Sequence, residues 1–244
     1  MSPDAAALEF RDVSYRIGGN LILDHLSFRI EPGRTLILLG RSGSGKTTAL
    51  KMLNGLLFPT SGEVLVEDRA TTNWDLIELR RSIGYVIQEV GLFPHFTIGE
   101  NVGLVPRLKG WQPERVRARV DELLDQVGLE PGQFRDRYPR QLSGGQRQRV
   151  GVARALAAEP KLLLFDEPFG ALDPVTRVEL QDQFLELRER VRKTSIFVTH
   201  DVREALRLGT EIALLHRGKL EVLTTPSKFQ NSNGPEARAF LSTL

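Results

Sequence analysis

Apolar and polar residues alternate over the first thirty positions of the chain. The apolar positions are Leu8, Phe10, Val13, Tyr15, Ile17, Leu26, Phe28 and Ile30. A period of two predicts half-buried antiparallel strands, because successive side chains of a strand point to opposite faces of the sheet. Gly18-Gly19-Asn20 is a turn signal between two such strands. The N-terminal part is therefore expected to be an antiparallel β region.

Further along the chain, short uninterrupted apolar runs replace this alternation. They are Leu36 to Leu39, Leu162 to Phe165, Ser195 to Val198 and Ile212 to Leu215. Such runs predict strands that are buried on both faces. Helices are expected between them, over Thr47 to Leu57 and over Leu180 to Val191, where apolar residues follow helical spacing. Buried strands that alternate with amphipathic helices indicate an α/β fold with a mainly parallel sheet.

The middle of the chain, residues 89–158, has no apolar run of this kind. Val116, Val120, Leu123 and Val127 lie on one helical face, so this segment is expected to be a helical insertion. The expected organisation is one domain over residues 1–244. Its catalytic core comprises 1–88 and 159–225, its helical subdomain is 89–158, and a short tail follows over 226–244.

A phosphate-binding pattern follows the first buried run. In Gly40-Arg41-Ser42-Gly43-Ser44-Gly45-Lys46-Thr47, two glycines with four residues between them precede Lys and Thr. Glycines let backbone N–H groups approach phosphate oxygens, and the start of the following helix favours anions. Lys46 would contact the β- and γ-phosphates, and the Thr47 hydroxyl would ligate Mg²⁺. The predicted ATP site comprises Gly40, Ser42, Gly43, Ser44, Gly45, Lys46, Thr47 and Thr48.

Two carboxylates end the run Leu162 to Phe165. Asp166 and Glu167 would lie at the carboxyl edge of the sheet, where α/β proteins bind ligands. Asp166 would hold Mg²⁺ through water, and Glu167 would polarise the attacking water. The alternative is a helix start, since the first turn of a helix also favours acidic residues.

A capping box occurs at Ser143-Gly144-Gly145-Gln146, because Ser precedes Gln by three positions. It predicts a helix that begins here and continues to Ala158. Two glycines in the first turn cost about 1 kcal/mol each relative to Ala, so they suggest that bare N–H groups must approach something. A phosphate is the natural occupant of such a helix start.

With Leu142 this segment reads LSGGQ, the signature of ATP-binding cassette (ABC) proteins, and the chain resembles that family over nearly all of residues 8–225. The resemblance implies a phosphate-loop NTPase core of RecA-like type, with an antiparallel β subdomain and a helical insertion. It also implies a head-to-tail dimer with ATP at the interface. Ser143, Gly144, Gly145 and Gln146 would then act in trans on nucleotide held by Lys46 and Thr47 of the other subunit.

The resemblance assigns roles to four more residues. Tyr15 would stack on adenine, although alternation alone also allows a core aromatic. Gln88 would reach Mg²⁺ or water and link the site to the membrane subunits. Asp173, in Ala171-Leu172-Asp173, would contact the other subunit. His200 would contact the γ-phosphate, although a lone His after a strand is often only a surface residue. His25, His95 and His216 match no such position and are expected to be structural.

The implied activity is ATP hydrolysis, with ATP and Mg²⁺, that powers separate transmembrane permease subunits from the cytoplasmic face of the membrane. The partners would be a second copy or a similar ATPase subunit, the permease and a solute-binding protein. The segments Gly84 to Gln88 and Leu92 to His95 are most similar to importers of osmoprotectants such as glycine betaine, choline or proline. Members of that group often carry paired CBS domains. Because this chain ends at Leu244, no ionic-strength sensing through this subunit is expected.

Composition restricts the other possibilities. The net charge is +2, so nothing points to nucleic acid, and the chain has no Cys for disulfides or thiolate metal sites. Its longest apolar runs are far shorter than the roughly 20 residues of a spanning helix, and its first residues do not resemble a signal peptide. The alternatives are an importer ATPase for nitrate, sulfonate, polyamines or amino acids, an exporter ATPase, a soluble cassette ATPase that acts on nucleic acid, and a small-molecule kinase. RNA or DNA that stays bound to the chain in a pull-down would favour the cassette that acts on nucleic acid. Co-purification without any solute-binding protein would favour the exporter. ATPase activity without ATP-driven dimers would favour the kinase.

Overall fold

The computed structural model of the chain describes residues 6–88, 91–170 and 172–244. Outside the described residues lie Met1 to Ala5, where the sequence lacks a signal-peptide pattern, the first two residues of the predicted helical segment, and Ala171 of the predicted contact loop. The chain forms two compact units, one comprising Met1–Arg80 and Lys193–Leu244, the other Arg81–Arg192.

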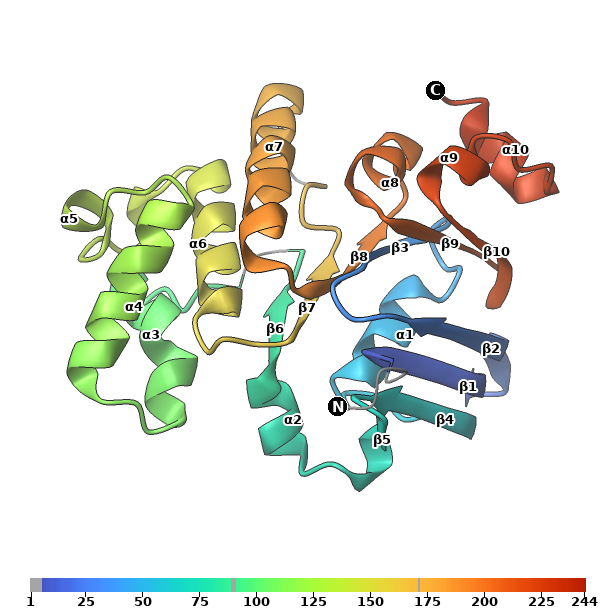
Figure 1. The fold of residues 1–244 in the computed structure, drawn as a ribbon, viewed down its shortest axis with the longest axis horizontal. Coiled ribbons are helices and arrows are strands. Elements are labelled where there is room, and N and C mark those ends of the chain that lie inside the picture. The colour runs from blue at the N-terminus through green and yellow to red at the C-terminus, as the bar shows by residue number, and fades with distance from the viewer. Residues whose placement is uncertain (1–5, 89–90, 171) are drawn as a thin grey trace. The chain divides into compact units, whose positions relative to one another are not determined.

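The first unit contains the predicted antiparallel sheet. Its strands are β1 (Leu8–Ile17), β2 (Asn20–Ile30), β4 (Ser61–Val66) and β5 (Arg69–Ala70), in the order β2-β1-β4-β5 (Figure 1). The alternation holds at the start of β1, where Leu8 and Phe10 are buried. It fails at the end, because bulges interrupt the β1–β2 register after Phe10 and after Val13. As a result Tyr15 is half-buried and Ile17 is 59% exposed.

The same unit contains a second group of strands that carries the phosphate-binding pattern. β3 (Thr35–Leu39) pairs in parallel with β8 (Thr194–Thr199) and with β9 (Glu211–His216), and β10 (Lys219–Thr224) is antiparallel to β9. Every residue of β3 and β8 is buried, as the uninterrupted apolar runs predict. The parallel pairing confirms the predicted α/β arrangement.

The helical elements of the first unit are short: α1 (Lys46–Leu53), η1 (Thr71–Asn73), α2 (Leu76–Ser82, whose last two residues belong to the second unit), α8 (Val202–Leu208), α9 (Pro226–Phe229) and α10 (Pro235–Leu241). The prediction that α1 continues to Leu57 is wrong. Asn54 caps the helix, and Gly55 follows with φ +65°, a conformation that ends helices. The last nineteen residues contain α9 and α10, and Phe229 of α9 is fully buried.

The second unit pairs β6 (Ile83–Val86) in parallel with β7 (Leu162–Asp166). Its helical elements are α3 (Ile98–Leu108), α4 (Pro113–Gln126), α5 (Pro131–Phe134), η2 (Pro139–Gln141), α6 (Gly144–Leu156) and α7 (Pro174–Val191), of which α3 to α6 group together in Figure 1. As predicted, α4 buries Val116, Val120 and Leu123. α7 packs on β7 through Phe184 and Phe165, whose ring centroids lie 5.4 Å apart.

These elements confirm the predicted fold class: a mixed α/β fold with an N-terminal antiparallel sheet, parallel strands and a helical segment. None of the helices in the described part of the chain is both long and apolar enough to cross a membrane.

Candidate functional site

The predicted phosphate loop connects β3 to α1 in the first unit. Arg41, Ser42 and Gly43 are exposed, whereas Gly40 and Ser44 to Lys46 are buried. The Lys46 ammonium donates to the carbonyl oxygens of Gly40, at 2.8 Å, and of Arg41, at 3.0 Å. The Arg41 carbonyl also accepts from the Ser44 N–H at 3.2 Å. The loop therefore curls around its own lysine at the start of α1.

Glycine is required at two positions of this loop. Gly45 has φ +101°, and a Cβ there would lie 2.6 Å from Cδ2 of Leu23. A Cβ on Gly40 would collide with the carbonyl oxygen of Leu215. Both the left-handed backbone and the lack of space exclude larger residues at Gly45. The loop therefore has no space for a Cβ at Gly40 or Gly45. A glycine-rich turn on the surface would not need glycine at these positions for lack of space.

Two other predicted residues lie near this loop in the first unit. Leu39, which leads into the loop, pairs with Thr199 of the parallel strand β8, and the exposed His200 comes directly after Thr199. Since β3 and β8 are parallel, the loop and His200 lie at the same sheet edge. Tyr15 pairs with Leu23, the residue that packs against Gly45. Tyr15 is half-buried there, and its stacking on adenine stays a prediction.

The predicted acidic pair ends β7 in the second unit, and both residues are half-buried. Asp166 Oδ2 accepts from the Tyr85 hydroxyl of the neighbouring strand β6 at 3.4 Å. Burial and the nearby Asp166 carboxylate raise the pKa of Tyr85 well above its ordinary value. Tyr85 therefore stays neutral and keeps its hydrogen on the side that faces Asp166.

Glu167 has an unusual backbone conformation, with φ +46°. Non-glycine residues in this left-handed region cost on the order of 1 kcal/mol or more and often occur at functional sites. Its carbonyl accepts from Gly170 N at 3.2 Å, which closes a turn. A Cβ on Gly170 would lie 3.8 Å from Glu167 Oε2 and 3.9 Å from Gln88 Nε2. The structure therefore brings the side chains of Gln88 and Glu167 to the same face of Gly170. This strained turn does not fit the alternative of acids in the first turn of a helix, because α7 begins only at Pro174.

The signature segment forms the predicted capping box. Ser143 Oγ accepts from Gln146 N at 3.2 Å, and Gln146 Oε1 accepts from Ser143 N at 2.9 Å. The first intrahelical bond runs from Arg147 N to Ser143 O, so the Gly144 and Gly145 amides precede the helical ladder. Ser143 and Gly144 are exposed. The result is a rigid, solvent-facing helix start.

The two signature glycines differ. A Cβ on Gly144 would meet only Arg147 Nη2, at 3.9 Å, whereas a Cβ on Gly145 would lie 2.7 Å from Cγ2 of Thr176 in α7. Gly145 therefore has a packing role within the chain, which spacing alone did not reveal. Asp173 caps the same end of α7 by accepting from Thr176 N at 3.0 Å, and this bond lowers the pKa of Asp173. The predicted contact residue thus lies beside the signature helix in the second unit.

Sequence reasoning missed one contact of the phosphate loop. The guanidinium of Arg41 donates to Glu236 of α10 at 2.5 Å, and Glu236 also faces His216 Nδ1 at 3.4 Å. Glu236 belongs to the segment predicted as a short tail, and His216 was expected to be structural only. A signal was available, since Gly234-Pro235-Glu236 is a typical helix start. Nothing local indicates that this helix reaches the loop.

In chemical terms, the first unit offers a glycine-lined loop with a lysine for an anion, and the second offers carboxylates, an amide and a helix N-terminus. The described residues include no group of three or more His, Cys, Asp or Glu side chains that could hold a metal ion by itself. A divalent ion would therefore have to complete its coordination with ligand oxygens or water.

Comparisons with known proteins agree with this geometry. The family model "ABC transporter" matches residues 23–170. The osmoprotectant import ATP-binding protein OsmV of Salmonella typhimurium is 48% identical over 84% of this chain and 54% of its own length. The glycine betaine uptake ATP-binding protein YehX of Escherichia coli is 45% identical over 90% of this chain and 73% of its own.

A solved structure is similar as well. The ATP-binding cassette MJ0796, in a dimeric post-hydrolysis state bound to ADP and Pi, has a TM-score of 0.79 and 36% identity over 90% of this chain and 98% of its own. This chain spans about half the length of OsmV. The family match covers more than half of the residues, including the phosphate loop, the signature and the carboxylate pair. This chain is a member of the ABC transporter family.

Proposed function

We propose that this chain is the ATP-binding and ATP-hydrolysing subunit of an ABC importer. One observation carries the proposal: the chain has two anion-binding elements of different kinds. The phosphate loop surrounds Lys46, while α6 begins at the exposed Ser143 and Gly144, ahead of its first intrahelical hydrogen bond. In this proposal a triphosphate joins the loop of one copy to the signature helix of another.

The proposed roles follow from donor chemistry. Thr47 and Asp166 supply oxygen donors of the kind that Mg²⁺ prefers, and Gln88 supplies an amide oxygen. Mg²⁺, when bound with the nucleotide, neutralises charge on the phosphate oxygens. Glu167 orients and polarises the attacking water, and His200 contacts the γ-phosphate from the end of β8. Tyr15 stacks on adenine, and the remaining loop residues, Ser42, Gly43, Ser44 and Thr48, line the phosphates. The start of α6, with Gly145, packs against the start of α7, with Asp173, so both would approach the other copy together.

The experiment that tests this function is substitution of the proposed base. Glu167→Gln keeps the size and polarity of the side chain but removes the carboxylate, so ATP should bind and hardly turn over. We expect an ATP-loaded dimer by size-exclusion chromatography and a loss of turnover of at least about 100-fold. Glu186→Gln, which changes an exposed carboxylate of α7, is the control. A monomeric Glu167→Gln variant with normal turnover in saturating Mg-ATP would refute the assignment.

The proposed permease contact lies on the helical segment, and its surface supports this role. Phe93 is 41% exposed and packs against His95 and Phe96, with centroid distances of 6.1 and 5.3 Å. The fully buried Asn101 fixes this turn, since its side chain bonds both to Phe93 N, at 2.8 Å, and to Phe93 O, at 3.2 Å. A hollow of about 620 Å³ lies over α3 and α4 of the same segment, and its lining is mixed, with Trp111 among charged side chains.

This contact would place the chain at the cytoplasmic face of the membrane, with residues 89–158 as the helical subdomain. Phe93→Asp should reduce co-purification with the permease subunits from detergent-solubilised membranes. The ATPase activity of the isolated chain should remain. Leu108→Asp, at the end of α3 and 53% exposed, is the control. If the Phe93 variant is retained as well as the control, the permease contact lies elsewhere.

We further propose an osmoprotectant, such as glycine betaine, choline or proline, as the transported solute. The 48% identity to OsmV and the 45% identity to YehX support this class. Uptake of labelled glycine betaine, measured in cells with and without Lys46→Ala in this chain, is the test. Uptake that depends on Lys46 supports the class, and unchanged uptake in the variant contradicts it.

A further inference from the structure

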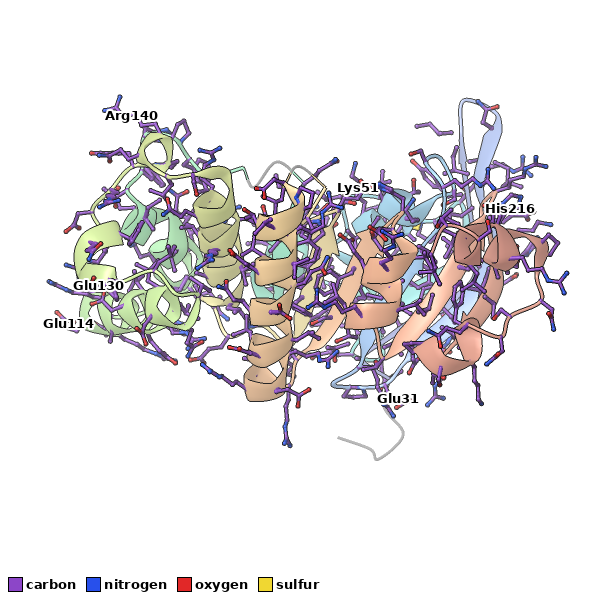
Figure 2. All side chains as sticks on the ribbon, turned by 90° about the horizontal axis from the view of Figure 1, so that it is seen from above. Glu31, Lys51, Glu114, Glu130, Arg140 and His216 are labelled. Atoms are coloured by element: carbon purple, nitrogen blue, oxygen red, sulfur yellow. The ribbon has the colours of Figure 1, made fainter. Side chains whose placement is uncertain are left out.

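A buried carboxylate on the last helix contacts the phosphate loop. Glu236, in the first turn of α10, is 7% exposed, and its Oε1 accepts from Arg41 Nε at 2.5 Å. Its other oxygen, Oε2, faces His216 Nδ1 at 3.4 Å. Figure 2 marks His216 at the end of β9, beside the C-terminal helices. A carboxylate this buried needs such partners, because desolvation without them is costly.

The position of Glu236 is itself fixed by the preceding strand. Glu221 of β10 accepts from the backbone amides of Glu236 and Ala237, each at 3.2 Å, and so caps the start of α10. Gly234 leaves room for this contact, since a Cβ on it would displace the Glu221 carboxylate. The carboxylate of Glu236 is thus presented by a strand and a helix that are locked together.

Arg41 connects this carboxylate to the centre of the loop. The Arg41 carbonyl accepts both from Ser44 N, at 3.2 Å, and from Lys46 Nζ, at 3.0 Å. On the other side of the loop, the Ser44 carbonyl accepts from Gly218 N at 3.1 Å, in the turn between β9 and β10. Two contacts from the segment that follows β9 therefore hold the loop, one through a backbone and one through an ion pair.

We propose that Glu236 is a positioning residue for nucleotide binding, which acts through Arg41 on the phosphate loop. The C-terminal segment, β10 to α10, is then part of the nucleotide-binding apparatus. The Glu236–Arg41 pair keeps the loop in its curled conformation before nucleotide arrives, so less conformational entropy is lost on binding. The proposal rests on the phosphate-binding role of Lys46.

Two neutral variants test this role. They separate it from the alternative that the charges of Glu236 and Arg41 act on the nucleotide only through their electrostatic field. Glu236→Gln and Arg41→Gln each remove the ion pair but change the net charge in opposite directions. If the pair positions the loop, both variants should raise the dissociation constant for Mg-ADP, by about three- to tenfold. The double variant should be no weaker than the weaker single variant. ADP is the probe because it lacks the γ-phosphate that the signature segment of a second copy would contact.

Three results would overturn the proposal. Opposite changes in affinity, with Glu236→Gln binding more tightly and Arg41→Gln more weakly, would indicate a field effect that salt screens. Unchanged affinity with a lowered melting temperature would mean that the pair only stabilises the fold. Additive losses in the double variant would mean that the two residues act independently. Arg41 lies on the surface, with a 66% exposed side chain, so its variant should fold even if Glu236→Gln does not.

Two further variants make the failures distinguishable. Glu31→Gln disrupts an exposed pair with Arg29 at the end of β2, and Figure 2 shows Glu31 well away from His216. It should leave ADP affinity unchanged. Lys46→Ala should weaken ADP binding on the order of 100-fold. If Lys46→Ala binds normally, the proposed site itself fails. If it binds this weakly while the Arg41 and Glu236 variants bind normally, only the positioning role fails.

Discussion

The phosphate loop and the signature segment both present backbone amides at the start of a helix, but they differ in how those amides are held. In the loop, Gly45 has no space for a Cβ, and Lys46 is bonded to two carbonyls of the loop. In the signature segment, Ser143 and Gly144 are exposed, and nothing lies within van der Waals distance of a Cβ on Gly144 except the end of Arg147. The first is held in its conformation by contacts within the chain, and the second is an open helix start.

This difference has a functional meaning within the ABC family. A loop that already curls around its own lysine can bind phosphate by itself, because glycine amides, a helix start and a cation lie in one segment. An exposed helix start has no cation of its own, so in the proposed dimer it would contact the phosphate of a nucleotide that is bound to the loop of another copy. The two elements therefore should respond differently to the same kind of substitution, and the following predictions use that difference.

The largest effect is expected from the loop cation. Lys46→Ala should weaken nucleotide binding on the order of 100-fold, because hydrogen bonds between a charged donor and phosphate contribute about 2–3 kcal/mol. Lys51→Ala, in the last turn of the same helix and labelled in Figure 2, should bind as the parent does. Calorimetric titration with Mg-ADP measures both, and normal binding by the Lys46 variant would contradict the role of the loop.

The next effect contrasts the glycines directly. Gly45→Ala should reduce the free energy of unfolding by about 2–3 kcal/mol, because of its positive φ and the contact with Leu23. Gly144→Ala, in the open first turn of α6, should leave stability unchanged or raise it by about 0.5 kcal/mol. It should nevertheless reduce turnover, because the new methyl group lies where a phosphate would approach. Urea unfolding and ATPase rates measure the contrast, and a Gly144 variant with full activity would argue against this approach.

A smaller effect separates the two possible roles of Asp173. Asp173→Ala removes the cap on Thr176 N and should reduce the free energy of unfolding by about 1 kcal/mol. Asp173→Asn keeps the cap, so its stability should match the parent within experimental error. If Asp173 also contacts the other copy through its charge, Asp173→Asn should still weaken ATP-driven dimers in the Glu167→Gln background. If the Glu167→Gln variant forms dimers equally well with and without Asp173→Asn, only the capping role of Asp173 remains.

The smallest effect is on the ionisation of Tyr85, which lies beside the Asp166 carboxylate at the end of β7. The chain has three Tyr residues, and burial together with Asp166 raises the pKa of Tyr85. Titration by ultraviolet absorbance should therefore contain a late ionisation step, and Tyr85→Phe should remove it. Because the pKa of Tyr85 is raised in the folded state, neutral Tyr85 contributes to the free energy of unfolding below the ordinary tyrosine pKa of about 10. This contribution is lost as the pH rises above that value. A titration without a late step, or a late step that persists in Tyr85→Phe, would contradict this environment.

Much of this structure was predictable because its signals are local. The buried strands follow from uninterrupted apolar runs, such as Leu36 to Leu39, and the start of α6 follows from Ser143 and Gln146 alone. The predicted end of α1 at Leu57 was wrong because the local signal at Asn54 and Gly55 was overlooked. Local order therefore decides most of these elements, and errors arise where a capping residue is misjudged.

Other features depend on tertiary contacts that no spacing encodes. Ile17 is exposed because bulges in β1 shift the side-chain alternation. Gly145 is required by Thr176, which lies thirty-one positions further along the chain. Glu236 reaches Arg41 only because Glu221 fixes the start of α10. Of the candidate site, the motifs could be predicted, whereas the side chains that support them could not.

The measurement that tests the central claim most directly is a crosslink between two differently substituted copies. The chain has no Cys, so Ser42→Cys on one copy and Ser143→Cys on an otherwise identical, size-tagged copy introduce one thiol each. In the Glu167→Gln background, mild oxidation should yield a disulfide-linked pair with one copy of each kind, and only with Mg-ATP. If both substitutions in one chain give only an intramolecular link, or if the mixed pair never forms with ATP bound, the nucleotide is not held between two copies.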